Sequence, residues 1–235
     1  MAEIIVALDL PSVDRALTLV DRLGHAADFY KVGAPLFTRG GAPLVHALRE
    51  RGKRVFLDLK FHDIPSTVAG AVEAAAELDV QLLTVHASGG VAMMRAAREA
   101  AGDHSVRLLG VTILTSLTTG DVERVWRREV HSIGDEVAHL ATLAVEAGLH
   151  GVVASPLEAE ALKRRHGAEL IVVTPGIRGP SDRTADQSRT ATAADAARAG
   201  ADYVVIGRPI IAASDPLAAY TSIRRELVDL EEVVA

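Results

Sequence analysis

The sequence predicts an α/β fold, a (β/α)8 barrel (TIM barrel), in a single domain of residues 1–235. Short β-branched or apolar runs alternate with Ala-rich helical patterns along the chain, which indicates a parallel sheet with crossover helices. Eight such units within 235 residues favour closure into a barrel over an open doubly wound sheet. Apolar residues make up 49% of the chain and aromatic residues only 3%. Val, Leu, Ile and Ala must therefore build the core, as they do where helices pack on a parallel sheet.

The eight apolar runs predict strands at residues 4–9, 29–33, 54–60, 82–86, 108–112, 151–155, 170–174 and 203–207. The patterns between them predict helices at residues 13–23, 42–51, 67–78, 91–101, 133–147, 158–166 and 193–199. Pro11 should stop the first strand, and Ser12 is placed to cap the first helix. In a barrel of this kind the carboxyl ends of all strands meet on one face, where the active site is built.

Charge and composition restrict the classes of partner. The net charge of -6 and the lack of a long basic run argue against binding to nucleic acid or a membrane surface. No stretch approaches the roughly 18 uninterrupted apolar residues of a membrane span. The chain has no cysteine, which excludes disulfides and a cysteine nucleophile and suits a reducing compartment. The first residues enter a strand without a basic region, so we expect no signal peptide and a cytoplasmic location.

The most informative segment is the run VFLDLKFHDIP at residues 55–65. It reads as a buried strand that ends in three charged residues, Asp58, Lys60 and Asp63. Because strand side chains alternate between faces, Asp58 and Lys60 should point the same way. A buried carboxylate beside an ammonium costs desolvation energy unless something compensates for it. Groups held in this way often do chemistry, although a structural ion pair that caps the strand is the alternative interpretation.

Other unusual residues also follow the predicted strands, and the barrel should bring them to the same face: Asp9, Lys31, His86, the segment 115–118, the segment 174–178, Gly207 and Arg208. Nine histidines occur, but none has the spacing of a known metal-binding motif. We therefore expect no metal site. A metal-binding role for His62 and His86 is the less favoured interpretation, and His86 fits better as a hydrogen-bond donor behind the site.

Five segments resemble the orotidine 5′-monophosphate decarboxylase family. They are ALD at 7–9, YKVG at 30–33, DLKFHDIP at 58–65, TPGIR at 174–178 and ADYVVIGRPI at 201–210. The D-x-K-x-x-D core is shared with related barrel enzymes that act on sugar phosphates, and the other segments make the resemblance specific. It implies decarboxylation of orotidine 5′-monophosphate to uridine 5′-monophosphate and CO2 in pyrimidine biosynthesis. It further implies that no cofactor is needed and that the enzyme is a homodimer with shared active sites.

The resemblance implies a catalytic role for each charged residue of the central motif. Lys60 corresponds to the lysine that protonates C6 of the pyrimidine as CO2 leaves, and Asp58 to the aspartate that faces the substrate carboxylate. Lys31 and Asp63 complete an alternating row, Lys31–Asp58–Lys60–Asp63. Asp63 and Thr67 are implied to reach into the active site of the neighbouring subunit.

The resemblance also implies which residues bind the rest of the nucleotide. Asp9 matches a ribose-contacting aspartate. Thr118 aligns with a position that contacts the pyrimidine edge, with Ser116 as a close competitor. Gln187, Gly207 and Arg208 are implied to hold the 5′-phosphate. Arg178 is implied to start the mobile loop that carries Gln187.

These roles agree with the chemistry of the reaction. Loss of CO2 leaves an unstable carbanion, and no cofactor motif in the sequence offers an electron sink. The site must therefore stabilise developing charge with fixed charges and then deliver a proton. An ammonium beside two carboxylates stays protonated and can reach the carbon. We expect this electrostatic effect to exceed ground-state destabilisation by Asp58.

Two other functions remain open from the sequence. One is a Mg²⁺-dependent sugar-phosphate aldolase or decarboxylase of the same barrel group, which full activity in excess EDTA would exclude. The other is a non-catalytic phosphate-binding barrel such as a ligand sensor. A sensor has no need of the charged residues Asp58, Lys60 and Asp63, so we disfavour it.

Overall fold

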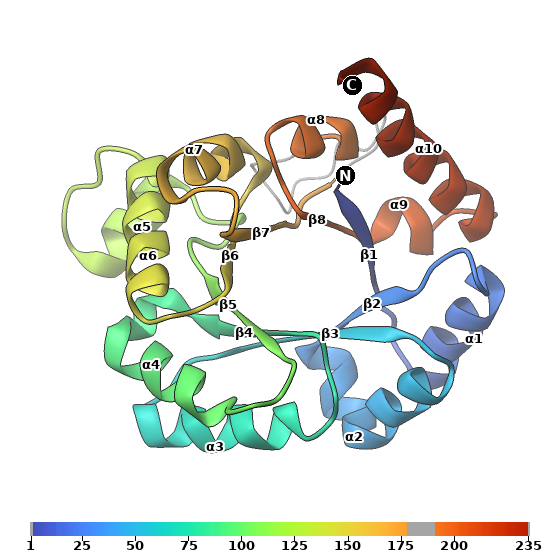
Figure 1. The fold of residues 1–235 in the computed structure, drawn as a ribbon, viewed down its shortest axis with the longest axis horizontal. Coiled ribbons are helices and arrows are strands. Elements are labelled where there is room, and N and C mark those ends of the chain that lie inside the picture. Colours follow the sequence, from blue (N-terminus) through green and yellow to red (C-terminus); the bar gives the residue numbers. More distant parts are fainter. Residues whose placement is uncertain (1, 178–190, 235) are drawn as a thin grey trace.

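The computed structural model describes residues 2–177 and 191–234. Eight parallel strands close into a barrel in which each strand pairs with the next and the last pairs with the first (Figure 1). This confirms the predicted (β/α)8 barrel. The strands are β1 (Glu3–Ala7), β2 (Phe29–Gly33), β3 (Arg54–Phe61), β4 (Leu82–His86), β5 (Arg107–Val111), β6 (Gly151–Val153), β7 (Ile171–Thr174) and β8 (Tyr203–Ile206).

Helices surround this barrel on its outer face (Figure 1). The described helices are α1 (Val13–Leu23), α2 (Ala34–Glu50), α3 (Pro65–Ala76), the 3-10 turn η1 (Ala87–Gly89), α4 (Gly90–Ala100), α5 (Thr119–Trp126), α6 (Ile133–Glu146), α7 (Pro156–His166), α8 (Ala193–Arg198), α9 (Arg208–Ile211) and α10 (Pro216–Val234). None of them is long and apolar enough to cross a membrane, as far as the described residues go.

Most predicted helices agree with the structure to within two residues at each end. Ser12 caps α1 as expected, because its side chain accepts a hydrogen bond from the backbone N–H of Arg15. The exception is α2, which starts at Ala34 rather than at residue 42. The two halves of α2 join at Gly41, whose φ of 52° breaks the helical pattern, so the sequence pattern revealed only the second half.

The hydrophobic core has two parts, one on each face of the sheet. Inside the barrel lie the side chains of Ile5, Ala7, Phe29, Phe56, Leu82, Leu109, Val173 and Val205. A larger layer fills the space between the strands and the helices. Strands buried on both faces read as continuous apolar runs, which is why they could be recognised in the sequence.

Arg54 lies at the amino-terminal end of the barrel, at the start of β3. Its guanidinium lies over the ring of Phe29, 4.4 Å from the ring centre, and it donates hydrogen bonds to Glu3 and Asp28. The Phe29 ring meets the Tyr203 ring edge to face. The carboxyl ends of the strands form the opposite end of the barrel.

Gly151 sets the spacing between β6 and β7, and Gly151→Ala tests this close approach. A Cβ at this buried position would lie 2.8 Å from the carbonyl carbon of Ile171 and closer still to its oxygen. Because backbone must move to relieve this clash, we expect Gly151→Ala to lower the free energy of unfolding by about 1–3 kcal/mol. Equilibrium denaturation in urea at fixed protein concentration measures the change.

Gly120→Ala is the matched control, since nothing lies within 4 Å of the Cβ it would add to helix α5. We expect this change to be neutral or to stabilise by less than about 1 kcal/mol. Equal stability of the two variants would contradict the packing assigned to Gly151.

Candidate active site

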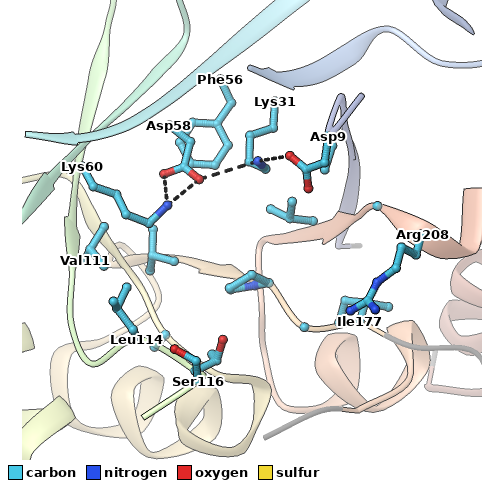
Figure 2. Close-up of a pocket in the computed structure, with 18 of the residues that line it drawn as sticks. Asp9, Lys31, Phe56, Asp58, Lys60, Val111, Leu114, Ser116, Ile177 and Arg208 are labelled. Atoms are coloured by element: carbon cyan, nitrogen blue, oxygen red, sulfur yellow. Dashed lines mark hydrogen bonds and ion pairs between the residues drawn. The ribbon is translucent and has the colours of Figure 1, made fainter. Parts of the chain in front are cut away.

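A cavity of about 570 Å³ opens at the carboxyl ends of the strands. Its polar lining consists of Asp9, Lys31, Asp58, Lys60, Thr115, Ser116 and Arg208, and its apolar lining includes Phe56, Val111, Ile113, Val153, Pro175 and Ile177. Figure 2 shows Lys60 and Asp58 at one end of this cavity and Arg208 at the other. The cavity therefore combines charged ends with an apolar wall.

Four charged side chains form a continuous row along one side of the cavity (Figure 2). Lys60 Nζ lies 2.8 Å and 2.7 Å from the two carboxylate oxygens of Asp58. Lys31 Nζ lies 3.7 Å from Asp58 Oδ2 and 3.0 Å from Asp9 Oδ1. The charge row, defined here as Asp9–Lys31–Asp58–Lys60, thus alternates in sign and balances two carboxylates against two ammonium groups.

Asp58 is the centre of the charge row, and its side chain is only 12% exposed. Burial alone would raise its pKa, because it disfavours the charged carboxylate. The positive charges of Lys60 and Lys31, with hydrogen bonds from Lys60 and Thr84, outweigh burial and hold the pKa of Asp58 below its usual value. Asp58 is therefore an anion at neutral pH, in contact with two cations.

The strands determine the order of the charge row. Asp9 follows β1, Lys31 belongs to β2, and Asp58 and Lys60 belong to β3, three strands that neighbour one another in the barrel. The prediction that Asp58 and Lys60 share a face is confirmed, since both line the cavity. The regular alternation of side chains along a strand explains this shared face only in part, because β3 is irregular at this point. Its pairing with β4 shifts register between Leu57 and Phe61.

Lys60 has an unusual backbone conformation. Its φ is 51°, in the left-handed region that costs a residue with a Cβ about 1–2 kcal/mol. The other described non-glycine residues with positive φ, Asp79 and Arg127, lie outside the strands. Strain of this kind persists only where surrounding contacts hold it, and here it aims a lysine into the cavity.

Gly207 and Arg208 lie where β8 ends and the short helix α9 begins. Both line the cavity, and their assignment to the 5′-phosphate stays a prediction. Arg178 and Gln187, which were predicted to share this role, lie outside the described residues.

Thr118 and Ser116 are the two candidates for contact with the pyrimidine edge, and they differ in their position relative to the cavity. Ser116 lines the cavity, whereas Thr118 does not. Thr118 is the N-cap of α5, where its hydroxyl and backbone N–H both donate to the Asp121 carboxylate. A residue held in this capping role faces the helix end, so the structure favours Ser116.

Asp63 and Thr67 lie outside the cavity of their own chain. Asp63 is exposed and accepts a hydrogen bond from the backbone N–H of Ile64, and Thr67 is exposed near the start of α3. The predicted row Lys31–Asp58–Lys60–Asp63 is therefore not formed within one chain. Asp9 instead occupies the end of the charge row next to Lys31.

Two histidines, His62 and His86, lie close to each other, and His86 is also near Lys60. The rings of His62 and His86 are 5.2 Å apart, and burial, followed by the charges of His62 and Lys60, lowers the pKa of His86. In the part of the chain that the structure describes, no three side chains of the types that bind metals gather in one place.

Sequence reasoning missed two parts of the site. One is the apolar wall from the ends of β5 and β6, where Ile113 and Val153 line the cavity. Their position at the end of a predicted strand, or just after one, was the signal that could have placed them at the cavity. The other is Thr84 of β4, whose hydroxyl donates to Asp58 Oδ1 at 3.0 Å. A single threonine in an apolar strand offered no comparable signal.

The chain is similar to known proteins over nearly its whole length. The model of the orotidine 5′-phosphate decarboxylase / HUMPS family matches residues 2–223. The orotidine 5′-phosphate decarboxylase of Moorella thermoacetica is 48% identical over 235 residues, which cover 96% of this chain and 92% of that protein. The enzyme of the same name from Nitrosococcus oceani is 46% identical over 228 residues, with 96% and 97% covered.

A solved structure supports the same relationship. The crystal structure of orotidine 5′-phosphate decarboxylase from Lactobacillus acidophilus superposes with a TM-score of 0.84 at 37% identity, and covers 97% of this chain and 99% of that one. The sequence match, the barrel and the pair of Asp58 and Lys60 at the cavity thus agree. The chain belongs to the orotidine 5′-phosphate decarboxylase / HUMPS family.

Proposed function

We propose that this protein decarboxylates orotidine 5′-phosphate to uridine 5′-phosphate and CO2 for pyrimidine biosynthesis, without a cofactor. The observation that carries the proposal is the charge row, with ionised Asp58 held against Lys60 at one end of an apolar cavity. The names of the similar enzymes support it. We further infer that residues 1–235 act as one domain in the cytoplasm, where a chain without cysteine suits the reducing conditions.

The reaction requires that a bond break without an electron sink. When the bond from C6 to the carboxylate carbon breaks, its electron pair stays on C6 and neutral CO2 departs. In our proposal the Lys60 ammonium stabilises this developing negative charge and transfers a proton from Nζ to C6. The apolar wall around the site strengthens this attraction, because charges interact more strongly where water is excluded.

Asp58 has two effects on this reaction. Its carboxylate pairs with the Lys60 ammonium and holds it at the cavity. It also places a negative charge where the substrate carboxylate would lie, and that repulsion ends when neutral CO2 leaves. Both effects favour the transition state over the bound substrate, which is the requirement for catalysis.

Arg208 is the residue we assign to the 5′-phosphate. A guanidinium can bind phosphate through two hydrogen bonds, and Arg208 lies across the cavity from Lys60 (Figure 2). Gly207 beside it lets the backbone approach the anion. Binding of this remote phosphate can then position the pyrimidine at the charge row. Arg178 and Gln187 remain the resemblance-based candidates for the same group, with Asp9 at the ribose.

We also propose a homodimer in which each subunit contributes to the other's site. Residues 62–67 form an exposed run directly after β3, and its apolar member Ile64 is 64% exposed. Asp63 is only three positions beyond Lys60 yet lies outside the cavity of its own chain. An exposed apolar side chain between an acid and Thr67 suits a subunit contact, through which Asp63 and Thr67 would reach the neighbouring cavity.

The direct test of the proposed function is the loss of pyrimidine absorbance when purified protein is mixed with orotidine 5′-phosphate. We expect decarboxylation that is unchanged in excess EDTA and much slower with orotidine, which lacks the phosphate that Arg208 would bind. Activity that disappears in EDTA and returns with Mg²⁺ would instead favour the sugar-phosphate class. A complete lack of turnover would contradict the proposal.

Replacement of Lys60 separates proton delivery from charge. Lys60→Ala should lower kcat roughly 10³-fold or more, because a general acid and a stabilising charge are lost together. Lys60→Arg keeps the positive charge, but a guanidinium does not give up its proton at neutral pH, so it should also be nearly inactive. Absorbance assays measure kcat, and circular dichroism checks that both variants fold. Substantial turnover by either variant would contradict the assignment of the proton donor.

Mixing two inactive variants tests the shared site. After subunit exchange between Lys60→Ala and Asp63→Ala, half of the dimers are mixed, and one of the two sites in each mixed dimer carries neither change. Activity should therefore recover to about one quarter of wild type for random exchange in a symmetric dimer. Each variant incubated alone is the control. No recovery despite demonstrated exchange would show that Asp63 acts within its own chain.

A further inference from the structure

Thr84 is a polar residue in an otherwise apolar part of the barrel. It belongs to β4, where its neighbours are Leu82, Leu83 and Val85, and it is fully buried. It does not line the cavity, so it is placed behind the charge row and out of reach of a substrate. A buried hydroxyl costs free energy unless it is hydrogen-bonded, so its partners indicate what it does.

The Thr84 hydroxyl joins the two central residues of the charge row. Its oxygen accepts a hydrogen bond of 2.9 Å from the backbone N–H of Lys60. The same hydroxyl donates a hydrogen bond of 3.0 Å to Asp58 Oδ1. A threonine hydroxyl has one donor and two acceptor sites, so it can make both bonds at once, whereas an apolar side chain of the same size could make neither.

These bonds lie where the sheet is irregular. Leu57 pairs with Leu83 and Phe61 pairs with Val85, so β3 advances four residues while β4 advances two. Lys60 lies within this bulge with its φ of 51°, and its N–H bonds to the Thr84 side chain. Bulges of this kind re-aim side chains at active sites, and a strained residue needs a contact that holds it. Thr84 supplies that contact.

We propose that Thr84 is a positioning residue for the decarboxylation, because its hydroxyl ties the strained backbone of Lys60 to the carboxylate of Asp58. This inference rests on the proposed function. Through Thr84, the proton donor and the carboxylate that faces it are held in one geometry before the substrate binds. Preorganisation of this kind is what an electrostatic mechanism requires, since a misplaced charge stabilises the transition state less.

Thr84→Val tests the role of the hydroxyl, because valine keeps the shape of threonine and removes both hydrogen bonds. We expect kcat for orotidine 5′-phosphate to fall roughly 10- to 100-fold, the effect of losing one hydrogen bond to a charged group. KM and the affinity for uridine 5′-phosphate should change less than about threefold, because Thr84 does not touch the ligand and uridine 5′-phosphate carries no carboxylate to face Asp58. Thr84→Ser, which keeps the hydroxyl, should retain most of kcat.

Thr112→Val is the matched control. Thr112 is also buried, and its hydroxyl donates to the backbone carbonyl of Val153 rather than to the charge row. It reports what the loss of a buried threonine hydroxyl does to the barrel in general. We expect it to lower the melting temperature about as much as Thr84→Val does, with a much smaller effect on kcat.

The outcomes separate this inference from the proposed function. If the wild type does not decarboxylate orotidine 5′-phosphate, the proposed function fails. If the wild type is active, a kcat of Thr84→Val within twofold of wild type overturns the role of Thr84. Equal losses of kcat in Thr84→Val and Thr84→Ser also overturn it, as does a loss of kcat in Thr112→Val equal to that in Thr84→Val. Should Thr84→Val fail to fold, Thr84→Ala is compared with Thr84→Ser on the same criteria.

Discussion

The site depends on the stabilisation of one carboxylate anion, that of Asp58, in a position that water barely reaches. A carboxylate that is 12% exposed would take up a proton if burial acted alone. Lys31 and Lys60 on either side keep it ionised, and Asp9 balances the charge of Lys31. The Asp58 anion is therefore stable only because its two lysine neighbours are present. Removing either lysine takes away part of the compensation for this buried charge.

The barrel supplies the geometry that this constraint requires. Ala7 of β1 is in register with Lys31 of β2, and Gly33 of β2 with Asp58 of β3, so neighbouring strands bring the charges together in order. Below them lies the apolar interior of the barrel, with Arg54 over the Phe29 ring at its far end. Fixed charges above an apolar wall can do electrostatic chemistry on a substrate without reorganising.

Much of this arrangement could be predicted from the sequence. Strands buried on both faces appear in the sequence as continuous apolar runs, so the strands could be predicted. Asp58 and Lys60 could be predicted as site residues, because charged side chains at the end of such a run are costly to bury. The bulge at Lys60 and the hydroxyl of Thr84 could not be predicted, since both depend on how β3 pairs with β4. The choice between Ser116 and Thr118 depended in the same way on where α5 begins. Local patterns identify the elements, whereas register and capping decide which side chains face the cavity.

Asp58 and Asp63 belong to one sequence motif but have different environments in the structure. Asp58 lines the cavity at the carboxyl ends of the strands, while Asp63 lies on the exposed run before α3. Proton delivery at the centre of the row is tested most directly by exchange of the C6 proton of uridine 5′-phosphate in D2O, followed by NMR. If the row stabilises a C6 carbanion and Lys60 delivers its proton, the wild type must catalyse the reverse proton removal and incorporate deuterium at C6, and Lys60→Ala must not. No exchange by the wild type, or equal exchange by both proteins, would contradict this mechanism.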